Sequence, residues 1–525
     1  MSARAAPAAE APLLALDRLS LSIAERPILR DVSLAVAPGE VLGLVGESGS
    51  GKSMTALAAI GLAPEGARTT GAIRLDGRDL TALRERDWLS VRGTEIAMIF
   101  QEPMTALNPV HRICAQVSET LRLNGTPRAE AARIARERLD RVGLGAIPAD
   151  RYPHELSGGQ RQRVCIALAI ARRPRLLIAD EPTTALDVTT QAGILELLRG
   201  LVREEGMALV LITHDLGVVA GMADRVAVMK DGAIVEEGPT EALFRARAHP
   251  YTRALLAASM PAAPAAARPA GEPVLEARDV VRDYGGFRAV DGASLTLRRG
   301  QSLGLVGESG CGKSPLTSAL LGLEPVQGGT IALMGRPGGT AMTKGDRARI
   351  SIVFQDPYGS FDPRWTVRRI VQEPFHLTGR PPDADARAAA ALERVGLGPD
   401  ALARHPHAFS GGQRQRIAIA RALVTDPDVV VLDEAVSALD VRVRAQVLDL
   451  LGALRARLGL SYLFVTHDLS VVRAVCDDVL VMRAGRIVER GSVAEVLDAP
   501  REEYTRRLVA AAPRVPEAWL AEESP

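Results

Sequence analysis

The chain has few aromatic side chains and almost no net charge. Phe, Trp and Tyr together make up 3% of its 525 residues, which argues against an aromatic platform that stacks single-stranded nucleic acid. Its formal net charge is +1, so no excess of positive charge is available to attract a phosphate backbone. We therefore expect no nucleic-acid partner.

Cysteine is also scarce, and long apolar runs are missing. The four cysteines are isolated from one another, which excludes zinc and iron–sulfur spacings and favours reduced thiols: Cys114, Cys165, Cys311 and Cys476. The first residues, MSARAAPAAEAP, lack the apolar core of a signal peptide. No uninterrupted apolar stretch reaches the roughly 18 residues that a transmembrane helix needs. We expect any membrane role to depend on partner subunits.

Lysine is rare where arginine is abundant. Lys and Arg total 64, yet only four are lysines, at positions 52, 230, 313 and 344. Two of the four lie in glycine-rich segments. Lysine provides a compact point charge there, which the larger planar guanidinium of arginine cannot replace. Apolar residues make up 47% and charged residues 24%, typical of globular domains with cores, and the length suggests two to four of them.

The two halves of the chain repeat one another. Five motifs recur in the same order: GESGSGKS and GESGCGKS, IFQEP and VFQDP, LSGGQRQR and FSGGQRQR, IADEPTTALD and VLDEAVSALD, ITHDL and VTHDL. The last three pairs are 253 positions apart, the second 254 and the first 261. Such a period indicates a tandem domain duplication, because solenoid repeats span about 20–50 residues.

A Pro/Ala-rich stretch marks the joint between the halves. PAAPAAARPAGEP is almost uncharged and typical of a semi-stiff linker. We predict a first domain over 1–258, a linker over 259–273 and a second domain over 274–525. In each half, apolar runs such as VLGLVG, RLLIAD and DVVVLDE predict buried parallel strands. A helical segment is predicted over 129–144.

Each glycine-rich motif fits the pattern G-x-x-x-x-G-K-[ST] between a strand and a helix. Backbone N–H groups of such a loop and the following helix N-terminus bind phosphates. Lys52 and Lys313 are expected to reach the β- and γ-phosphates of ATP, and Ser53 and Ser314 to bind Mg²⁺. The complete predicted loops are Gly46, Glu47, Ser48, Gly49, Ser50, Gly51, Lys52 and Ser53, and Gly307, Glu308, Ser309, Gly310, Cys311, Gly312, Lys313 and Ser314.

An acidic pair ends an apolar strand in each half. Asp180 and Asp433 are placed to hold Mg²⁺ directly or through water. Glu181 and Glu434 follow them and are candidate general bases for an attacking water. Such a pair seen alone is more often a solvated turn, but the glycine loop upstream in both halves favours catalysis.

The complete motif set resembles that of the ABC ATPases, over nearly the whole chain and twice. This resemblance rests on SGGQ, the Gln of FQEP and FQDP, the ALD after the acidic pair and the His of THD. It implies two tandem P-loop α/β domains, each a mixed β-sheet core with helices plus a helical subdomain. It also implies hydrolysis of ATP to ADP and phosphate with Mg²⁺, Gln101 and Gln355 as further metal ligands, and His214 and His467 orienting the γ-phosphate and water. A lone His is more often structural, but its repetition favours function.

In that family each ATP lies between one domain's glycine loop and the other domain's SGGQ. The resemblance therefore implies that the first loop pairs with Ser410, Gly411, Gly412, Gln413 and Asp440, and the second with Ser157, Gly158, Gly159, Gln160 and Asp187. Tyr284 is expected to stack on adenine; the matching position in the first half is Ile23. Ala435 and Pro315 depart from the usual residues without removing a catalytic group, so both sites are predicted to be active.

The segment HPYTRALLAASMP resembles the C-terminal extension of oligopeptide/dipeptide importer ATPases. The segment REEYTRRLVAAAP in the second half resembles the same extension more weakly. The chain also resembles the fused tandem ATPases of microcin C and glutathione import. The resemblance implies two integral-membrane permease subunits, an extracytoplasmic solute-binding protein and a peripheral location at the cytoplasmic face of the inner membrane. It leaves the solute open.

A soluble twin-ABC factor that acts on ribosomes is the alternative. Such factors carry a long charged linker between their domains, whereas this linker is short and nearly uncharged. A DNA-repair ABC protein would need long coiled-coil or zinc insertions, which this sequence does not contain. The importer interpretation is therefore favoured.

Overall fold

A computed structural model describes residues 11–184, 186–259, 271–437 and 439–520 of the chain. Within these residues the chain forms two compact units. Unit 1 comprises residues 11–184, 186, 190–259 and 513–520. Unit 2 comprises residues 187–189, 271–437 and 439–512. Most of the predicted linker, residues 260–270, lies outside the described residues.

Unit 1 contains two sheets. A four-stranded antiparallel sheet has the order β2-β1-β4-β5, with β1 (Leu14–Ile23), β2 (Arg26–Val36), β4 (Ala67–Leu75) and β5 (Arg78–Asp79). A six-stranded sheet has the order β10-β9-β3-β8-β7-β6, with β3 (Val41–Val45), β6 (Ile96–Ile99), β7 (Leu176–Asp180), β8 (Ala208–Thr213), β9 (Arg225–Lys230) and β10 (Ala233–Pro239). Five of these six strands are parallel, and β10 pairs with β9 in the antiparallel sense.

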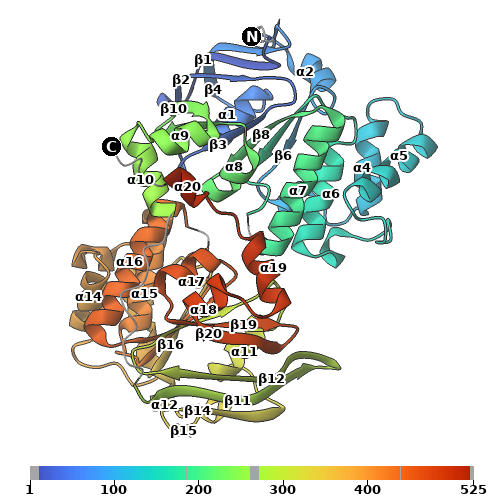
Figure 1. The fold of residues 1–525 in the computed structure, drawn as a ribbon. Helices are drawn as coiled ribbons and strands as arrows, with labels where there is room; N and C mark the ends of the chain where they lie inside the picture. The colour runs from blue at the N-terminus through green and yellow to red at the C-terminus, as the bar shows by residue number, and fades with distance from the viewer. Residues whose placement is uncertain (1–10, 185, 260–270, 438, 521–525) are drawn as a thin grey trace, which may run out of the picture. The chain divides into compact units, whose positions relative to one another are not determined.

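The helices of unit 1 flank the six-stranded sheet or form a separate group beside it. They are α1 (Lys52–Ala59), α2 (Glu85–Val91), α3 (Pro103–Ala106), α4 (Ile113–Arg122), α5 (Arg128–Arg141), α6 (Gly158–Ala169), α7 (Val188–Glu205), α8 (Leu216–Met222), α9 (Thr240–Ala246), α10 (Pro250–Ser259) and α20 (Glu517–Leu520). Helices α4 and α5 pack on each other beside α6, which makes the helical subdomain (Figure 1). The predicted helix over 129–144 is α5, which ends before Gly143 because that glycine has a left-handed φ of 79°.

Unit 2 repeats this architecture. Its antiparallel sheet has the order β12-β11-β14-β15, with β11 (Pro273–Tyr284), β12 (Phe287–Arg298), β14 (Gly328–Leu333) and β15 (Arg336–Pro337). Its six-stranded sheet has the order β16-β17-β18-β13-β19-β20, with β13 (Ser302–Val306), β16 (Ile350–Val353), β17 (Val429–Asp433), β18 (Ser461–Thr466), β19 (Asp478–Arg483) and β20 (Arg486–Ser492).

The helices of unit 2 follow the same sequence of elements. They are α11 (Lys313–Leu320), α12 (Lys344–Arg347), α13 (Val367–Gln372), α14 (Ala384–Arg394), α15 (Gly411–Leu423), α16 (Val441–Leu458), α17 (Leu469–Val475), α18 (Val493–Asp498) and α19 (Glu503–Ala511). The predicted fold class, two tandem α/β domains with mixed sheets and helical subdomains, is confirmed.

The core of unit 1 lies on both faces of the six-stranded sheet. Along β7, Leu176 and Ile178 face the antiparallel sheet, while Leu177 and Ala179 face the helices. All five residues of β7 are buried. The continuous apolar run in the sequence predicted this, because a parallel strand is covered on both sides. This covering leaves the carboxyl ends of the strands as the edge where polar side chains can gather.

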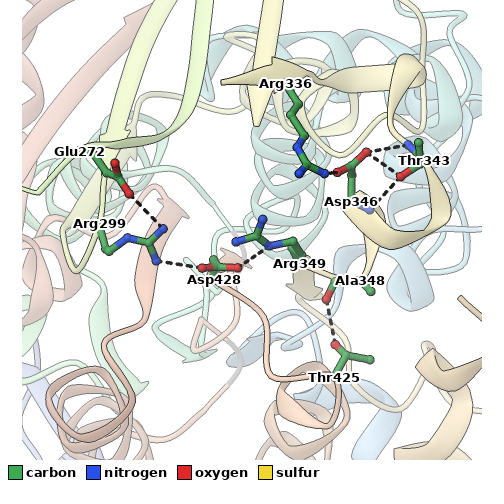
Figure 2. A network of polar contacts seen from close by, with 9 residues as sticks. All are labelled: Glu272, Arg299, Arg336, Thr343, Asp346, Ala348, Arg349, Thr425 and Asp428. Atoms are coloured by element: carbon green, nitrogen blue, oxygen red, sulfur yellow. Dashed lines mark hydrogen bonds and ion pairs between the residues drawn. The ribbon is translucent and has the colours of Figure 1, made fainter. Parts of the chain in front are cut away.

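A partly exposed ion-pair network anchors the amino-terminal end of β17 in unit 2 (Figure 2). Asp428 accepts hydrogen bonds from Arg299 at 2.9 Å and from Arg349 at 2.8 Å. Burial acts to raise the pKa of Asp428, but the two arginines outweigh it and lower the pKa. The network joins the loop before β13 to the start of β16 and to β17.

Residues 513–520 pack on unit 1 at the end of the chain's described part. The indole ring of Trp519 lies 6.2 Å from the ring of Phe244, centroid to centroid. Arg245 donates to the carbonyl oxygen of Ala518 at 2.7 Å, and Arg247 to that of Leu520 at 3.3 Å. This segment therefore covers apolar surface on α9 that would otherwise face solvent.

Among the described residues, none of the helices combines the length and the apolar character needed to cross a bilayer. All four cysteines are free thiols, and three of them are buried.

Candidate functional site

Each glycine loop connects a fully buried strand to a helix. The first runs from β3 to α1, and the second from β13 to α11. Gly51 and Gly312, which precede the helices, have left-handed φ values of 105° and 111°. A side chain at either position would be strained, so glycine is required for the turn that aims the backbone N–H groups at one point.

The two predicted lysines lie inside these loops. Lys52 Nζ donates to the carbonyl oxygens of Gly46 and Glu47, both at 2.8 Å. Lys313 Nζ makes the same contacts with Gly307 at 2.7 Å and Glu308 at 2.9 Å. Both side chains are buried. A buried ammonium needs such partners, and bound phosphate oxygens could replace these carbonyl groups.

The predicted aspartates end β7 and β17 beside the glycine loops. Asp180 is 4% exposed, and its Oδ1 atom has no hydrogen-bond partner among the described residues. Burial raises the pKa of Asp180, a hydrogen bond from Ser53 opposes the rise, and the charge of Glu181 adds to it. Burial and the Glu434 charge raise the pKa of Asp433 to about 6. An acidic oxygen without a partner is suited to a cation.

The next residue in each half is the predicted general base, and its backbone is strained. Glu181 and Glu434 have φ values of 47° and 48°, in the left-handed region that residues with a side chain rarely adopt. Hydrogen bonds hold this backbone in place: the N–H of Glu181 donates to Ile212 at 2.9 Å, and that of Glu434 to Val465 at 2.8 Å. Strain of this kind is concentrated at functional sites.

A histidine contacts each of these glutamates. His214 Nδ1 lies 3.1 Å from Glu181 Oε1, and His467 Nδ1 lies 3.0 Å from Glu434 Oε1. Burial acts to raise the pKa of Glu181, but the hydrogen bond and charge of His214 outweigh it and, with Thr184 and Lys52, lower the pKa to about 2. The pKa of Glu434 is lowered by His467 against the same effect of burial.

The predicted glutamines follow β6 and β16. Gln101 Nε2 donates to Glu181 Oε2 at 3.0 Å, so the first half brings together Lys52, Ser53, Gln101, Asp180, Glu181 and His214. Gln355 has the same place after β16 and is exposed. Among the described residues, no group of three or more His, Cys, Asp or Glu side chains could hold a metal ion by itself. A cation here would therefore also need hydroxyl, amide or phosphate oxygens.

The SGGQ motifs begin α6 and α15 as capping boxes. Ser157 Oγ accepts from the N–H of Gln160 at 3.3 Å, and the Gln160 side chain accepts from the N–H of Ser157 at 3.0 Å. Ser410 and Gln413 repeat the arrangement at 3.4 and 3.1 Å. This role for the serine and glutamine was not predicted from the sequence, although S-x-x-Q before a helix is a known capping signal.

The second glycine of each SGGQ allows two helices to approach. A Cβ atom on Gly159 would come within 2.2 Å of Thr190 Cγ2, and one on Gly412 within 2.4 Å of Val443 Cγ1. Gly158 and Gly411 stand just before them with more space. Asp440 caps α16 by accepting from the N–H of Val443 at 3.0 Å, and Asp187 immediately precedes α7.

Tyr284 and Ile23 occupy matching places, because each is the last residue of the first strand in its unit. The Tyr284 ring is 41% exposed, and the guanidinium of Arg282 lies 4.2 Å from its centroid. Its hydroxyl donates to Glu324. Ile23 packs against the apolar core.

The sequence pattern did not single out Tyr251 and Tyr504, which contact the glycine loops. The N–H of Glu47 donates to Tyr251 Oη at 3.1 Å, and the N–H of Glu308 to Tyr504 Oη at 3.0 Å. The signal was present in the sequence, since these tyrosines also lie 253 positions apart.

Comparison with known proteins identifies the family. A sequence model of the ABC transporter family matches residues 29–184 and 290–437. One described as the C-terminal region of oligopeptide/dipeptide transporters matches residues 235–280 and 488–524.

Curated relatives match almost end to end. The peptidoglycan transport ATP-binding protein YejF of Agrobacterium fabrum is 48% identical over 95% of this chain and 96% of its own length. The glutathione import ATP-binding proteins GsiA of Shigella dysenteriae and Escherichia coli K12 are each 45% identical over 92% of this chain and 86% of their own length. The chain therefore belongs to the ABC transporter family of ATPases and carries its ATP-binding domain twice.

Proposed function

We propose that this chain is the ATP-hydrolysing motor subunit of an importer for oligopeptides, dipeptides or related peptide-like solutes. The observation that carries the proposal is the presence, in both halves, of the lysine-filled glycine loop, the Asp-Glu pair and the glutamate-bound histidine, followed by an oligopeptide-type C-terminal region. The relatives' names, peptidoglycan transport and glutathione import, both denote cargo that contains peptide units. The ribosome alternative is not supported by these relatives.

The residues at each site fit ATP with Mg²⁺. Asp180 has a buried carboxylate oxygen without a partner, and the Ser53 side chain bonds to the same carboxyl group. Ser53, Gln101 and Asp180 would hold the ion in the first half, and Ser314, Gln355 and Asp433 in the second. Mg²⁺ at this place would neutralise charge on the phosphates. The lysines would exchange the loop carbonyl groups for phosphate oxygens, and Tyr284 would stack on adenine.

Glu181 and Glu434 would accept the proton of the attacking water. A carboxylate with a pKa of about 2 is ionised at neutral pH but is a weak proton acceptor. The contact with His214 lowers the pKa of Glu181, and the contact with His467 lowers that of Glu434. Each glutamate would therefore become a better base when its histidine turns away. A γ-phosphate that draws the histidine towards itself would raise the basicity of the glutamate only when ATP is bound.

Each ATP would lie between the glycine loop of one half and the SGGQ of the other. Lys52, Asp180, Glu181 and His214 would then act with Ser410, Gly412 and Asp440, and the second loop with Ser157, Gly159 and Asp187. Support comes from the position of SGGQ at the start of a capped helix, whose N-terminus attracts negative charge.

Two integral-membrane permeases would dock on the helical subdomains, with a solute-binding protein outside and the chain at the cytoplasmic face of the membrane. In the first half a cavity of about 380 Å³ follows Gln101 and includes Asn108, Leu123 and Leu168 in its lining. Arg421 takes the place of Leu168 in the second half, where it donates to the carbonyl oxygen of Ser360 at 2.9 Å and to Glu373 at 3.3 Å. The two docking surfaces differ, which favours two different permease subunits.

Reconstitution tests the proposal. The full chain would be placed in vesicles with a candidate pair of permeases and a candidate solute-binding protein from the same organism, together with a labelled dipeptide or oligopeptide. We expect uptake that requires ATP and is lost when Lys52 and Lys313 are both changed to alanine, because the phosphate contacts are removed. ATPase activity that responds to ribosomes but not to the permeases would overturn the proposal.

A further inference from the structure

The C-terminal extension of each half reaches its own glycine loop through one tyrosine. Tyr251 lies on α10 and Tyr504 on α19, and both side chains are buried, 5% and 7% exposed. Their hydroxyl oxygens accept the N–H of Glu47 and Glu308, the second residue of each loop. Packing of the helix on its domain does not require a hydrogen bond to the glycine loop. The contact therefore indicates a role at the loop.

The support behind each tyrosine is also duplicated. Glu236 accepts from the N–H groups of Ala248 and His249 at 3.0 and 3.3 Å, directly before α10. Glu489 accepts from those of Arg501 and Glu502 at 2.8 and 3.2 Å, directly before α19. These carboxylates fix where each helix begins, and therefore where its tyrosine points.

A cation covers each tyrosine ring. Lys230 Nζ lies 5.3 Å from the centroid of the Tyr251 ring, and the Arg483 guanidinium 5.0 Å from that of Tyr504. Such contacts restrain the ring in addition to apolar packing. Both halves of the duplicated chain keep the hydroxyl contact, the carboxylate and the cation, although the sequence between these positions has diverged, which indicates a built arrangement.

The contact matters most when the lysine leaves the loop. Lys52 and Tyr251 hold the Glu47 residue from both sides, the first through its carbonyl oxygen and the second through its N–H. A lysine that turned towards phosphate would give up the loop carbonyl groups, and the peptide after Gly46 would lose one restraint beside glycine, the residue whose backbone rotates most easily. The hydrogen bond from the Glu47 N–H to the tyrosine hydroxyl would remain and hold the loop in its open shape.

We infer that Tyr251 and Tyr504 are positioning residues for ATP binding, which hold each glycine loop in its phosphate-accepting shape and tie it to the C-terminal extension. The inference rests on the proposed function of the loops. Burial raises the pKa of Tyr504 to about 12, so its hydroxyl stays protonated at working pH and accepts through a lone pair.

Tyrosine-to-phenylalanine variants of the full chain test the inference. Tyr251→Phe, Tyr504→Phe and the double variant would be compared by steady-state ATP hydrolysis and by calorimetric titration with MgADP. Loss of one neutral hydrogen bond predicts a rise of about three- to tenfold in the KM for ATP and in the Kd for MgADP at the altered site. The kcat should stay within about twofold, because the glutamate and histidine are untouched.

Tyr462→Phe is the matched control. Its hydroxyl is also buried and donates to the carbonyl oxygen of Leu451 at 3.0 Å, at the start of β18 and away from the loop. This variant should lower thermal stability and leave KM unchanged. Hydrogen–deuterium exchange of the segments 46–51 and 307–312 should accelerate in the two loop variants and not in the control.

The outcomes separate the two ideas. Absence of MgADP binding to the unaltered chain would refute the proposed function itself. Binding by the unaltered chain, with KM, Kd and loop exchange unchanged in both Tyr→Phe variants, would overturn the role of the tyrosines. A parallel fall in thermal stability without a change in KM would also overturn it, since it would show that the hydroxyl serves packing alone.

Discussion

Asp180 and Glu181 are neighbours in the chain, yet their surroundings move their pKa values in opposite directions. Burial raises the pKa of the aspartate, whereas the His214 contact lowers that of the glutamate. The cause lies in the direction of the side chains at the end of β7, with Asp180 towards the glycine loop and Glu181 towards His214. Two neighbouring acids whose pKa values are moved apart in this way are suited to different chemical roles.

Replacement of either glutamate by glutamine tests its task. Glu181→Gln or Glu434→Gln should reduce hydrolysis at the altered site by about 10²–10⁴-fold, because a general base contributes that much. The phosphate released at saturating MgATP measures the effect. Glu241→Gln, an exposed glutamate on α9, should leave turnover unchanged. Full turnover in both single variants would contradict the assignment, and loss in one alone would show that the halves are unequal.

At the scale of elements, close helix packing depends on a single glycine in each SGGQ. Helix α15 approaches α16 so closely that a Cβ on Gly412 would lie 2.4 Å from Val443 Cγ1. Valine is stiff at χ1 and cannot move aside cheaply. The same relation holds for Gly159 and Thr190 in the first half. The second glycine of this motif therefore has a packing role in addition to any contact with a nucleotide.

Gly412→Ala should lower the free energy of unfolding by about 1–3 kcal/mol, the usual cost of overpacking. Gly411→Ala is the control, because a Cβ there would meet nothing within 4 Å. Chemical denaturation followed by circular dichroism measures both. Equal stability of the two variants would show that the helices can move apart without cost.

The ion pairs before β17 give a second element-scale prediction. Asp428→Asn should lower the free energy of unfolding by about 1 kcal/mol at pH 7. Arg299 and Arg349 are partly exposed, and ion pairs near the surface contribute little to stability. A carboxyl whose pKa is lowered on folding stabilises above its unfolded pKa of about 3.9 and loses this contribution as pH falls through its folded value. The difference between the proteins should therefore shrink below about pH 4.

Denaturation curves at pH 7, 5 and 3.5 provide the measurement. Arg336→Gln changes an ion pair with Asp346, which lies in the same view but not in the Asp428 network, and serves as a control for a nearby charge change (Figure 2). A difference that is constant with pH would contradict the assigned cause.

At the scale of the whole molecule, each half has a glycine loop, an acidic pair and a histidine, and also an SGGQ helix. If each ATP joins a loop to the SGGQ of the other half, ATP that is not hydrolysed should hold the halves together. The Glu181→Gln/Glu434→Gln double variant should therefore have a smaller radius of gyration with MgATP than with MgADP. Small-angle scattering measures this change, and an unchanged radius with bound ATP would contradict the composite site.

The repeated motifs alone were enough to predict two α/β domains, both glycine loops and the residues after β7 and β17. Loop, strand and helix follow one another within about 15 residues there, so local pattern and geometry coincide. The family and the fold class predicted in this way are confirmed.

Only the tertiary structure determined which groups these residues contact. The left-handed backbone of Glu181 and Glu434, the histidine contact that lowers their pKa, and the helix packing at Gly412 all depend on partners far away in the chain. Tyr251 lies 204 residues from Glu47, and no local pattern predicts that its hydroxyl meets that N–H. Sequence motifs determine which reactive side chains the chain carries. The packing of distant elements determines which of these side chains contact one another, because hydrogen bonds and burial depend on distance in space.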